Sequence, residues 1–306
     1  MITRKKLFRY SVTGSLPDNP LKTHSPTLKV GLKTFFTFKG DPFMKTFLSA
    51  LFLVVLSTGI AQAEIKTEEI HYESGGTPLT GFLAYDDSAE KRPGILVVHE
   101  WWGHNQHARN RAIKLAEAGY TALALDMYGD GKLADHPQKA GEFMTAAFKD
   151  WEGSQAKFNA AKKVLQSHKT VDPERIGAIG FCFGGAVSIR MARGGADLKG
   201  VAGFHSALPL EPAIEKGQVK AAVLVLNGSD DGFIKPETVG SISSQMVAAN
   251  ADFTYVSMAG VKHSYTNPEA DTFSQKFNLP NLAYDKEADE RAWNTMLNFF
   301  KRLFAK

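Results

Sequence analysis

The sequence predicts an α/β protein in three layers, with a mostly parallel sheet covered by helices on both faces. Short apolar runs alternate along the chain with longer segments of helical periodicity, as in repeated strand–helix units. The apolar runs have no polar face, which is typical of strands that are covered on both sides. Strands joined by helices in this way lie parallel in one sheet.

The elements follow from these patterns in order. Two alternating stretches, Ile65–Tyr72 and Leu79–Tyr85, flank a Ser-Gly-Gly-Thr-Pro segment and predict an antiparallel hairpin. The other strands are predicted at Ile95–Val98, Thr121–Leu125, Ile176–Phe181, Gly200–Phe204, Ala221–Leu226 and Phe253–Val256. Helices are predicted at Gln106–Ala118, Gln138–His168, Gly185–Arg193, Pro236–Asn250 and Glu287–Phe304.

The first 63 residues differ from the rest. Residues 1–43 hold eight Lys and Arg against two Asp, whereas residues 64–306 carry a net charge of −3. Residues 44–63 begin with Met-Lys, continue with an apolar run and end in Ala-Gln-Ala, which is the pattern of a signal peptide. We expect Met44 to be the true start, with residues 1–43 an upstream extension that is disordered or not translated. An uncleaved membrane anchor is the alternative.

This pattern predicts an exported protein. We expect cleavage between Ala63 and Glu64, which leaves residues 64–306 as one α/β domain in the periplasm or outside the cell, with no stable membrane association. The acidic body gives no reason to expect a nucleic acid as partner. The sequence does not indicate an oligomeric state.

Cys182 is the one cysteine of the chain, and residues 179–185 read Ile-Gly-Phe-Cys-Phe-Gly-Gly. This is the spacing of a nucleophile elbow, with sulfur in place of the usual serine oxygen. A Cβ at Gly180 or Gly184 would collide with the neighbouring strand or helix. The helix that follows points its N-terminal N–H groups at the sulfur and favours the thiolate. A buried structural cysteine is the alternative.

Two later loops carry a candidate acid and a candidate base. Asp230 and Asp231 follow the strand that ends at Leu226, and His263 follows the strand that ends at Val256. We prefer Asp231 as the acid, because Asp230 is better placed to brace the turn. Either group alone has a structural explanation, as a helix cap or a turn residue. Nucleophile, acid and histidine nevertheless occur in the chain order of the α/β-hydrolase scaffold, each at the carboxyl end of a strand.

A fourth candidate, Glu100, lies in His-Glu-Trp-Trp-Gly past the end of another predicted strand. With Cys182 in Gly-Phe-Cys-Phe-Gly-Gly, Asp231 in Gly-Ser-Asp-Asp-Gly-Phe-Ile and His263 in Lys-His-Ser-Tyr-Thr-Asn-Pro, it completes a set of four motifs. Together these motifs resemble the dienelactone hydrolase family over nearly all of residues 65–306.

The resemblance implies a three-layer α/β-hydrolase fold and a Cys182–Asp231–His263 triad. It also implies that Glu100 contacts the resting thiol and helps to generate the thiolate. The backbone N–H groups of Trp101 and Phe183 would form the oxyanion hole, which agrees with the position of Phe183 at a helix N-terminus.

Three further aromatic side chains are candidates for the substrate pocket, namely Trp102, His205 and Tyr265. For His205, structural bracing at the end of its strand is an equal alternative. One position departs from the family pattern. Enzymes that open dienelactone hold its carboxylate with arginines, one of them four residues after the catalytic histidine, where this chain has Asn267. We therefore expect the reaction type of the family in this chain, but not dienelactone as its substrate.

Two motifs imitate metal sites. His99 and Glu100 are followed by His104, one residue too late for the His-Glu-x-x-His pattern of a zinc protease. The segment from Asp126 has Tyr128 in place of the third-position oxygen ligand of a calcium loop. We expect no metal and no cofactor.

The sequence thus predicts a cysteine-dependent hydrolase of a small ester, lactone or thioester, which works through an acyl-enzyme on Cys182. The alternative is a non-catalytic protein of the same fold that binds a small molecule or senses redox state.

Overall fold

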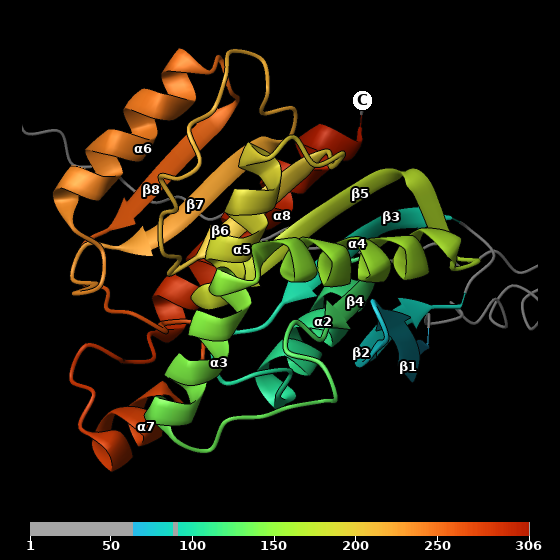
Figure 1. Cartoon of the computed structure of the whole chain (residues 1–306), viewed down its shortest axis with the longest axis horizontal. Helices are drawn as coiled ribbons and strands as arrows, with labels where there is room; N and C mark the ends of the chain where they lie inside the picture. Colours follow the sequence, from blue (N-terminus) through green and yellow to red (C-terminus); the bar gives the residue numbers. More distant parts are fainter. Residues whose placement is uncertain (1–63, 88–90, 306) are drawn as a thin grey trace, which may run out of the picture. The chain divides into compact units, whose positions relative to one another are not determined.

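The computed structural model describes residues 64–87 and 91–305, and these form an eight-stranded sheet with helices packed on it (Figure 1). The upstream extension and the signal peptide predicted from the sequence lie outside these residues. Along the sheet the strand order is β1-β2-β4-β3-β5-β6-β7-β8. β1 and β2 pair antiparallel, β2 pairs antiparallel with β4, and all other neighbours are parallel. The predicted hairpin and the mostly parallel sheet are therefore confirmed.

The strands are β1 (Ile65–Ser74), β2 (Thr77–Asp86), β3 (Arg92–Val98), β4 (Thr121–Leu125), β5 (Val171–Phe181), β6 (Gly200–Phe204), β7 (Ala222–Gly228) and β8 (Phe253–Met258). The helices are α2 (Gln106–Glu117), α3 (Pro137–Lys149), α4 (Trp151–Ser167), α5 (Phe183–Arg193), α6 (Pro236–Ala248), α7 (Ala270–Phe277) and α8 (Lys286–Phe304).

Two apolar cores separate the three layers. In β3, Leu96 and Val98 belong to the core beneath α4, α5 and α6, whereas Ile95 and Val97 belong to the core beneath α2 and α8. Successive side chains of a strand point to opposite faces, so a strand covered on both sides is apolar throughout. This explains why the sequence shows apolar runs without alternation.

Two helical regions differ from the sequence prediction. The segment predicted as one helix over residues 138–168 is divided into α3 and α4 at Asp150, whose carboxylate accepts a hydrogen bond from the N–H of Gly153 at 3.0 Å. An aspartate that caps a helix in this way begins a new helix. The short helix α7 was not predicted, and it ends at Asn278 in a left-handed conformation.

The carboxyl ends of the parallel strands lie at one edge of the sheet, where ligands bind in open α/β folds. β3, β5, β7 and β8 lead into the loops that carry Glu100, Cys182, Asp231 and His263, respectively. In the part of the chain that the structure describes, no helix combines the length and the apolar character needed to cross a membrane.

Candidate active site

Cys182 occupies a sharp turn between β5 and α5. Its φ is 52° and its ψ is −113°, a strained conformation for a residue other than glycine. Its backbone N–H donates to the carbonyl of Phe204 at 3.0 Å, which ties the turn to β6. A Cβ on Gly184 would collide with the carbonyl oxygens of Val98 and His99, and one on Gly180 would collide with the backbone of Gly184. The predicted need for glycine at both positions is confirmed.

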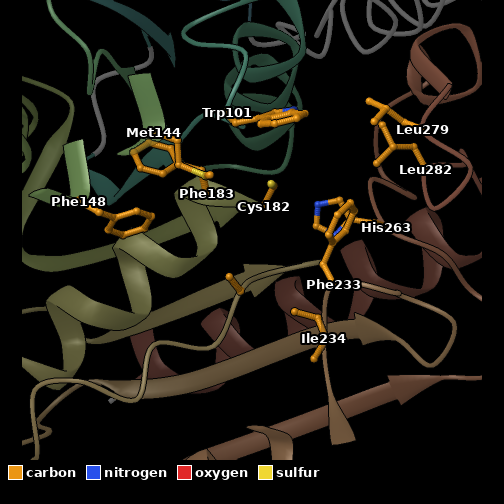
Figure 2. Close-up of a pocket in the computed structure, with 11 residues that line it drawn as sticks. Trp101, Met144, Phe148, Cys182, Phe183, Phe233, Ile234, His263, Leu279 and Leu282 are labelled. Carbon is orange, nitrogen blue, oxygen red and sulfur yellow. The ribbon is translucent and has the colours of Figure 1, made fainter. Parts of the chain in front are cut away.

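The loops after β7 and β8 bring Asp231 and His263 together. Asp231 Oδ2 lies 2.7 Å from His263 Nδ1, and both side chains are buried. The other carboxylate oxygen of Asp231 accepts from the N–H of Phe233 at 3.0 Å, which fixes the carboxylate. With Nδ1 held by Asp231, the Nε2 side of the ring is free to act on Cys182, toward which His263 is turned in Figure 2.

The charge state of His263 reflects both neighbours. Burial lowers the pKa of His263, but the adjacent Cys182 sulfur and the Asp231 carboxylate raise it to about 10. The arrangement therefore favours the protonated form of His263, whose ring lies beside Cys182. Cys182 is partly exposed to solvent.

The two predicted oxyanion donors have free backbone N–H groups. Among the described residues, no acceptor takes a hydrogen bond from the N–H of Trp101 or Phe183. The Tyr128 hydroxyl donates to the Trp101 carbonyl at 3.0 Å, and the Tyr128 ring packs on that of Phe183 with centroids 5.4 Å apart. Tyr128 therefore contacts both residues that carry these N–H groups.

Glu100 is buried, and both of its carboxylate oxygens have hydrogen-bond partners. Oε2 accepts from the Asn267 amide at 2.6 Å, and Oε1 accepts from the Ser264 hydroxyl at 3.1 Å. Its nearest histidines, His107 and His205, lie 3.8 and 3.9 Å away, and burial lowers the pKa of each, so both are neutral. Burial raises the pKa of Glu100, against the opposing effect of the Asn267 hydrogen bond.

The contact between Glu100 and the resting thiol, expected from the resemblance, is absent from the interactions of the described residues. The physical reason is that Ser264 and Asn267, which follow His263 in the same loop, already satisfy both carboxylate oxygens.

A cavity of about 230 Å³ opens beside Cys182 (Figure 2). Besides the sulfur and the His263 ring, its lining is formed by apolar side chains, namely Trp101, Met144, Phe148, Phe183, Ala207, Phe233, Ile234, Leu279 and Leu282. Most of these residues carry no signal in the sequence, since apolar residues in helices and loops are usually core. Four of them do stand in the recognised motifs: Trp101, Phe183, Phe233 and Ile234.

The three aromatic residues predicted to line the pocket do not line it. The Trp102 ring packs on Phe273 of α7, with centroids 4.7 Å apart. His205 Nε2 bonds the Thr266 hydroxyl at 2.8 Å, and the Tyr265 hydroxyl donates to the Leu226 carbonyl at 2.9 Å. All three side chains are buried. The alternative for His205, structural bracing, is the one that the structure supports.

The two motifs that imitate metal sites have other roles. Asp126 accepts hydrogen bonds from the backbone N–H groups of Tyr128, Gly129 and Gly131 and so shapes the loop after β4. His99 accepts from the N–H of Met127 through Nε2. Within residues 64–87 and 91–305, no group of three or more His, Cys, Asp or Glu is arranged to hold a metal ion.

The sheet, the strained elbow and the three aligned side chains define an α/β-hydrolase. The sequence profile of the dienelactone hydrolase family matches residues 79–304. The chain belongs to the dienelactone hydrolase family.

Individual relatives agree with this assignment. Protein usf of Aquifex pyrophilus is 28% identical over 236 residues, which are 76% of this chain and 96% of that protein. A relative from Aquifex aeolicus (strain VF5) bears the provisional name carboxymethylenebutenolidase and is 27% identical over the same length, with the same coverage of each chain. Among solved structures, a dienelactone hydrolase-like promiscuous phosphotriesterase from metagenomic libraries is 32% identical, with a TM-score of 0.74 over 78% of this chain and 98% of that one.

Proposed function

We propose that the chain cleaves a small carboxylic ester, lactone or thioester through an acyl-enzyme on Cys182. One arrangement supports this proposal above all: Asp231 is hydrogen-bonded to His263, the His263 ring lies beside Cys182, and Cys182 lines an apolar cavity. Membership of a family named for lactone hydrolysis supports the class of bond, as does the carboxymethylenebutenolidase name of one relative. The residues present require no cofactor for this chemistry.

In the first half-reaction, the Cys182 thiolate attacks the carbonyl carbon, and the electron pair of the carbonyl bond moves to the oxygen. The N–H groups of Trp101 and Phe183 bind this oxyanion, and each such donor contributes about 2.7–4 kcal/mol. When the carbonyl bond re-forms, the bond to the leaving oxygen or sulfur breaks. The imidazolium of His263 donates its proton to the leaving group.

In the second half-reaction, neutral His263 takes a proton from water, and the resulting hydroxide attacks the thioester of the acyl-enzyme. The Cys182 thiolate leaves, and the carboxylic acid departs. Asp231 holds Nδ1 of His263 throughout and stabilises its charged form. The resemblance implies that Glu100 helps to generate the thiolate. To do so, its carboxyl group has to leave its hydrogen bonds with Asn267 and Ser264 and contact the Cys182 sulfur.

The test is hydrolysis of a p-nitrophenyl ester by the purified chain beside Cys182→Ala and His263→Ala, with Ser244→Ala on exposed α6 as control. We expect His263→Ala to lose about 100-fold or more, as is typical for removal of a general acid–base, and Cys182→Ala to fall to background. The control should match the wild type. Equal rates in all four proteins would end the proposal and favour the non-catalytic alternative.

We also propose export of the chain, on the strength of the signal-peptide pattern in residues 44–63, which lie outside the described residues. N-terminal sequencing of the protein from the producing cell should begin at Glu64. A cytosolic chain that begins at Met1 would contradict export.

A further inference from the structure

We infer that the cavity beside Cys182 has two apolar subsites and that its substrate is neutral, with an apolar group on each side of the carbonyl carbon. This inference rests on the proposed function and names its substrate class. It assigns one set of side chains to the acyl group and another to the leaving group.

The lining of the cavity offers no side chain that could pair with a charged substrate. None of the described residues that line it is Lys, Arg, Asp or Glu, and its only titratable groups are Cys182 and His263. The charge of His263 is already balanced by the Asp231 carboxylate, 2.7 Å from Nδ1. A substrate carboxylate would therefore lose its water without gaining a counter-ion, which is strongly unfavourable in an apolar site.

Two polar groups that could bind a carboxylate, Arg111 and Asn267, already bind other partners. Arg111 lies in a separate cavity, where both of its terminal nitrogens lie 2.9 Å from the carboxylate of Asp289. The Asn267 amide is committed to Glu100. Neither group is among the residues that line the cavity at Cys182.

The position of His263 determines on which side of the sulfur the leaving group lies. His263 must protonate the leaving group, so the leaving group has to lie on the histidine side of the sulfur. Figure 2 shows Phe233, Leu279 and Leu282 on that side, and the Phe233 ring lies 4.9 Å from that of His263. Phe233 is 56% exposed, so this side communicates with solvent.

The acyl group must then lie on the opposite side of the sulfur. Figure 2 shows Met144, Phe148 and Phe183 there, with Cys182 between them and His263. Met144 and Phe148 come from α3, and Phe183 is the first residue of α5. The acyl subsite is therefore closed by one helix that packs over the elbow, and its walls are apolar.

The test compares esters of one length that differ in charge: p-nitrophenyl pentanoate and the p-nitrophenyl monoester of glutaric acid, which ends in a carboxylate. At neutral pH we expect kcat/KM for pentanoate to exceed that for the acid by at least about 100-fold. The neutral methyl p-nitrophenyl diester of glutarate controls for size and should recover most of the difference.

Four variants locate the effect in one subsite or the other. Met144→Arg should raise the relative kcat/KM of the glutarate monoester, whereas Met144→Leu should keep the wild-type preference. Phe148→Ala should shift the optimum toward longer acyl chains without changing the dependence of the rate on the alcohol. Leu282→Ala should shift the optimum toward larger alcohols without changing the dependence of the rate on the acyl chain. If Phe148→Ala changed the preference for the alcohol, or Leu282→Ala the preference for the acyl chain, the assignment of the subsites would be overturned.

The outcomes separate this inference from the function on which it rests. Hydrolysis that depends on Cys182 but favours the charged monoester would overturn the neutral substrate class and leave the cysteine mechanism intact. Absence of Cys182-dependent hydrolysis with every ester would overturn both.

Discussion

Glu100 and Asn267 are joined by a hydrogen bond of 2.6 Å between a buried carboxylate and a side-chain amide. The bond connects the loop after β3 with the loop that carries His263. Because the amide is neutral, it does not balance the charge of the carboxylate, and burial keeps the pKa of Glu100 above its ordinary value.

This relationship predicts a pH dependence of stability. A carboxyl whose pKa is raised on folding binds more protons in the folded state, so its contribution to stability falls as pH rises from the unfolded pKa through the folded one. We expect Glu100→Gln to lack this pH-dependent contribution to stability, because glutamine does not titrate. Urea unfolding of both proteins between pH 4.5 and pH 8 should show the wild type losing stability relative to the variant as pH rises. A constant difference would contradict the raised pKa.

The pair formed by Asp231 and His263 predicts an alkaline limit to activity. His263 must be protonated to release the leaving group, and its pKa lies at about 10. We expect kcat/KM to fall above pH 10. Asp231→Asn removes a group that raises this pKa, so the fall should move to lower pH, with a loss of rate of about 100-fold or more. An unchanged alkaline limit in Asp231→Asn would show that Asp231 does not tune His263.

Tyr128 predicts an effect on the rate without contact with the reacting bond. Its hydroxyl holds the Trp101 carbonyl, and its ring contacts Phe183, so its loss should loosen the proposed oxyanion hole. Direct removal of such a donor costs about 100-fold or more, and we expect Tyr128→Phe to lower kcat by about 10-fold with little change in KM. The matched control is Tyr85→Phe, a tyrosine that donates to Glu68 far from the site. A change in KM alone, or equal effects of both variants, would exclude the positioning role.

Gly184 predicts a large loss of stability on a small substitution. In Gly184→Ala the new methyl group would collide with the backbone of the loop after β3, which is not the flexible end of a side chain. We expect the free energy of unfolding to drop by about 3 kcal/mol or more, measured by urea unfolding. Gly141→Ala on α3 is the control, because beyond its chain neighbours and its own helix backbone its Cβ would meet no described atom within 4 Å, and it should gain up to about 1 kcal/mol. Equal stability of the two variants would contradict the close approach at the elbow.

The fold and the triad could be predicted because their signals are local. Apolar runs without a polar face mark covered strands, and the glycines around Cys182 report a close approach of the backbone. The positions of Asp231 and His263 follow from the strands that precede them, since carboxyl ends of parallel strands meet at one edge.

The orientation of individual side chains could not be predicted, because it depends on distant partners. Glu100 turns toward Ser264 and Asn267, which are 164 and 167 residues away in the sequence. Trp102 packs against Phe273 and Phe277 of α7 and does not line the cavity, and the sequence pattern did not predict that helix. The apolar walls of the cavity resemble ordinary core residues in the sequence, and only the tertiary packing separates them.

The central claim is a covalent acyl group on Cys182, and intact-protein mass spectrometry tests it most directly. The chain is mixed with a p-nitrophenyl ester and quenched during the first turnover, and the modified peptide is then sequenced. The account predicts a mass increase equal to one acyl group, located on the peptide with Cys182 and absent from Cys182→Ala. Hydrolysis at full rate with the acyl group on another residue, or with Cys182→Ala as active as the wild type, would contradict it.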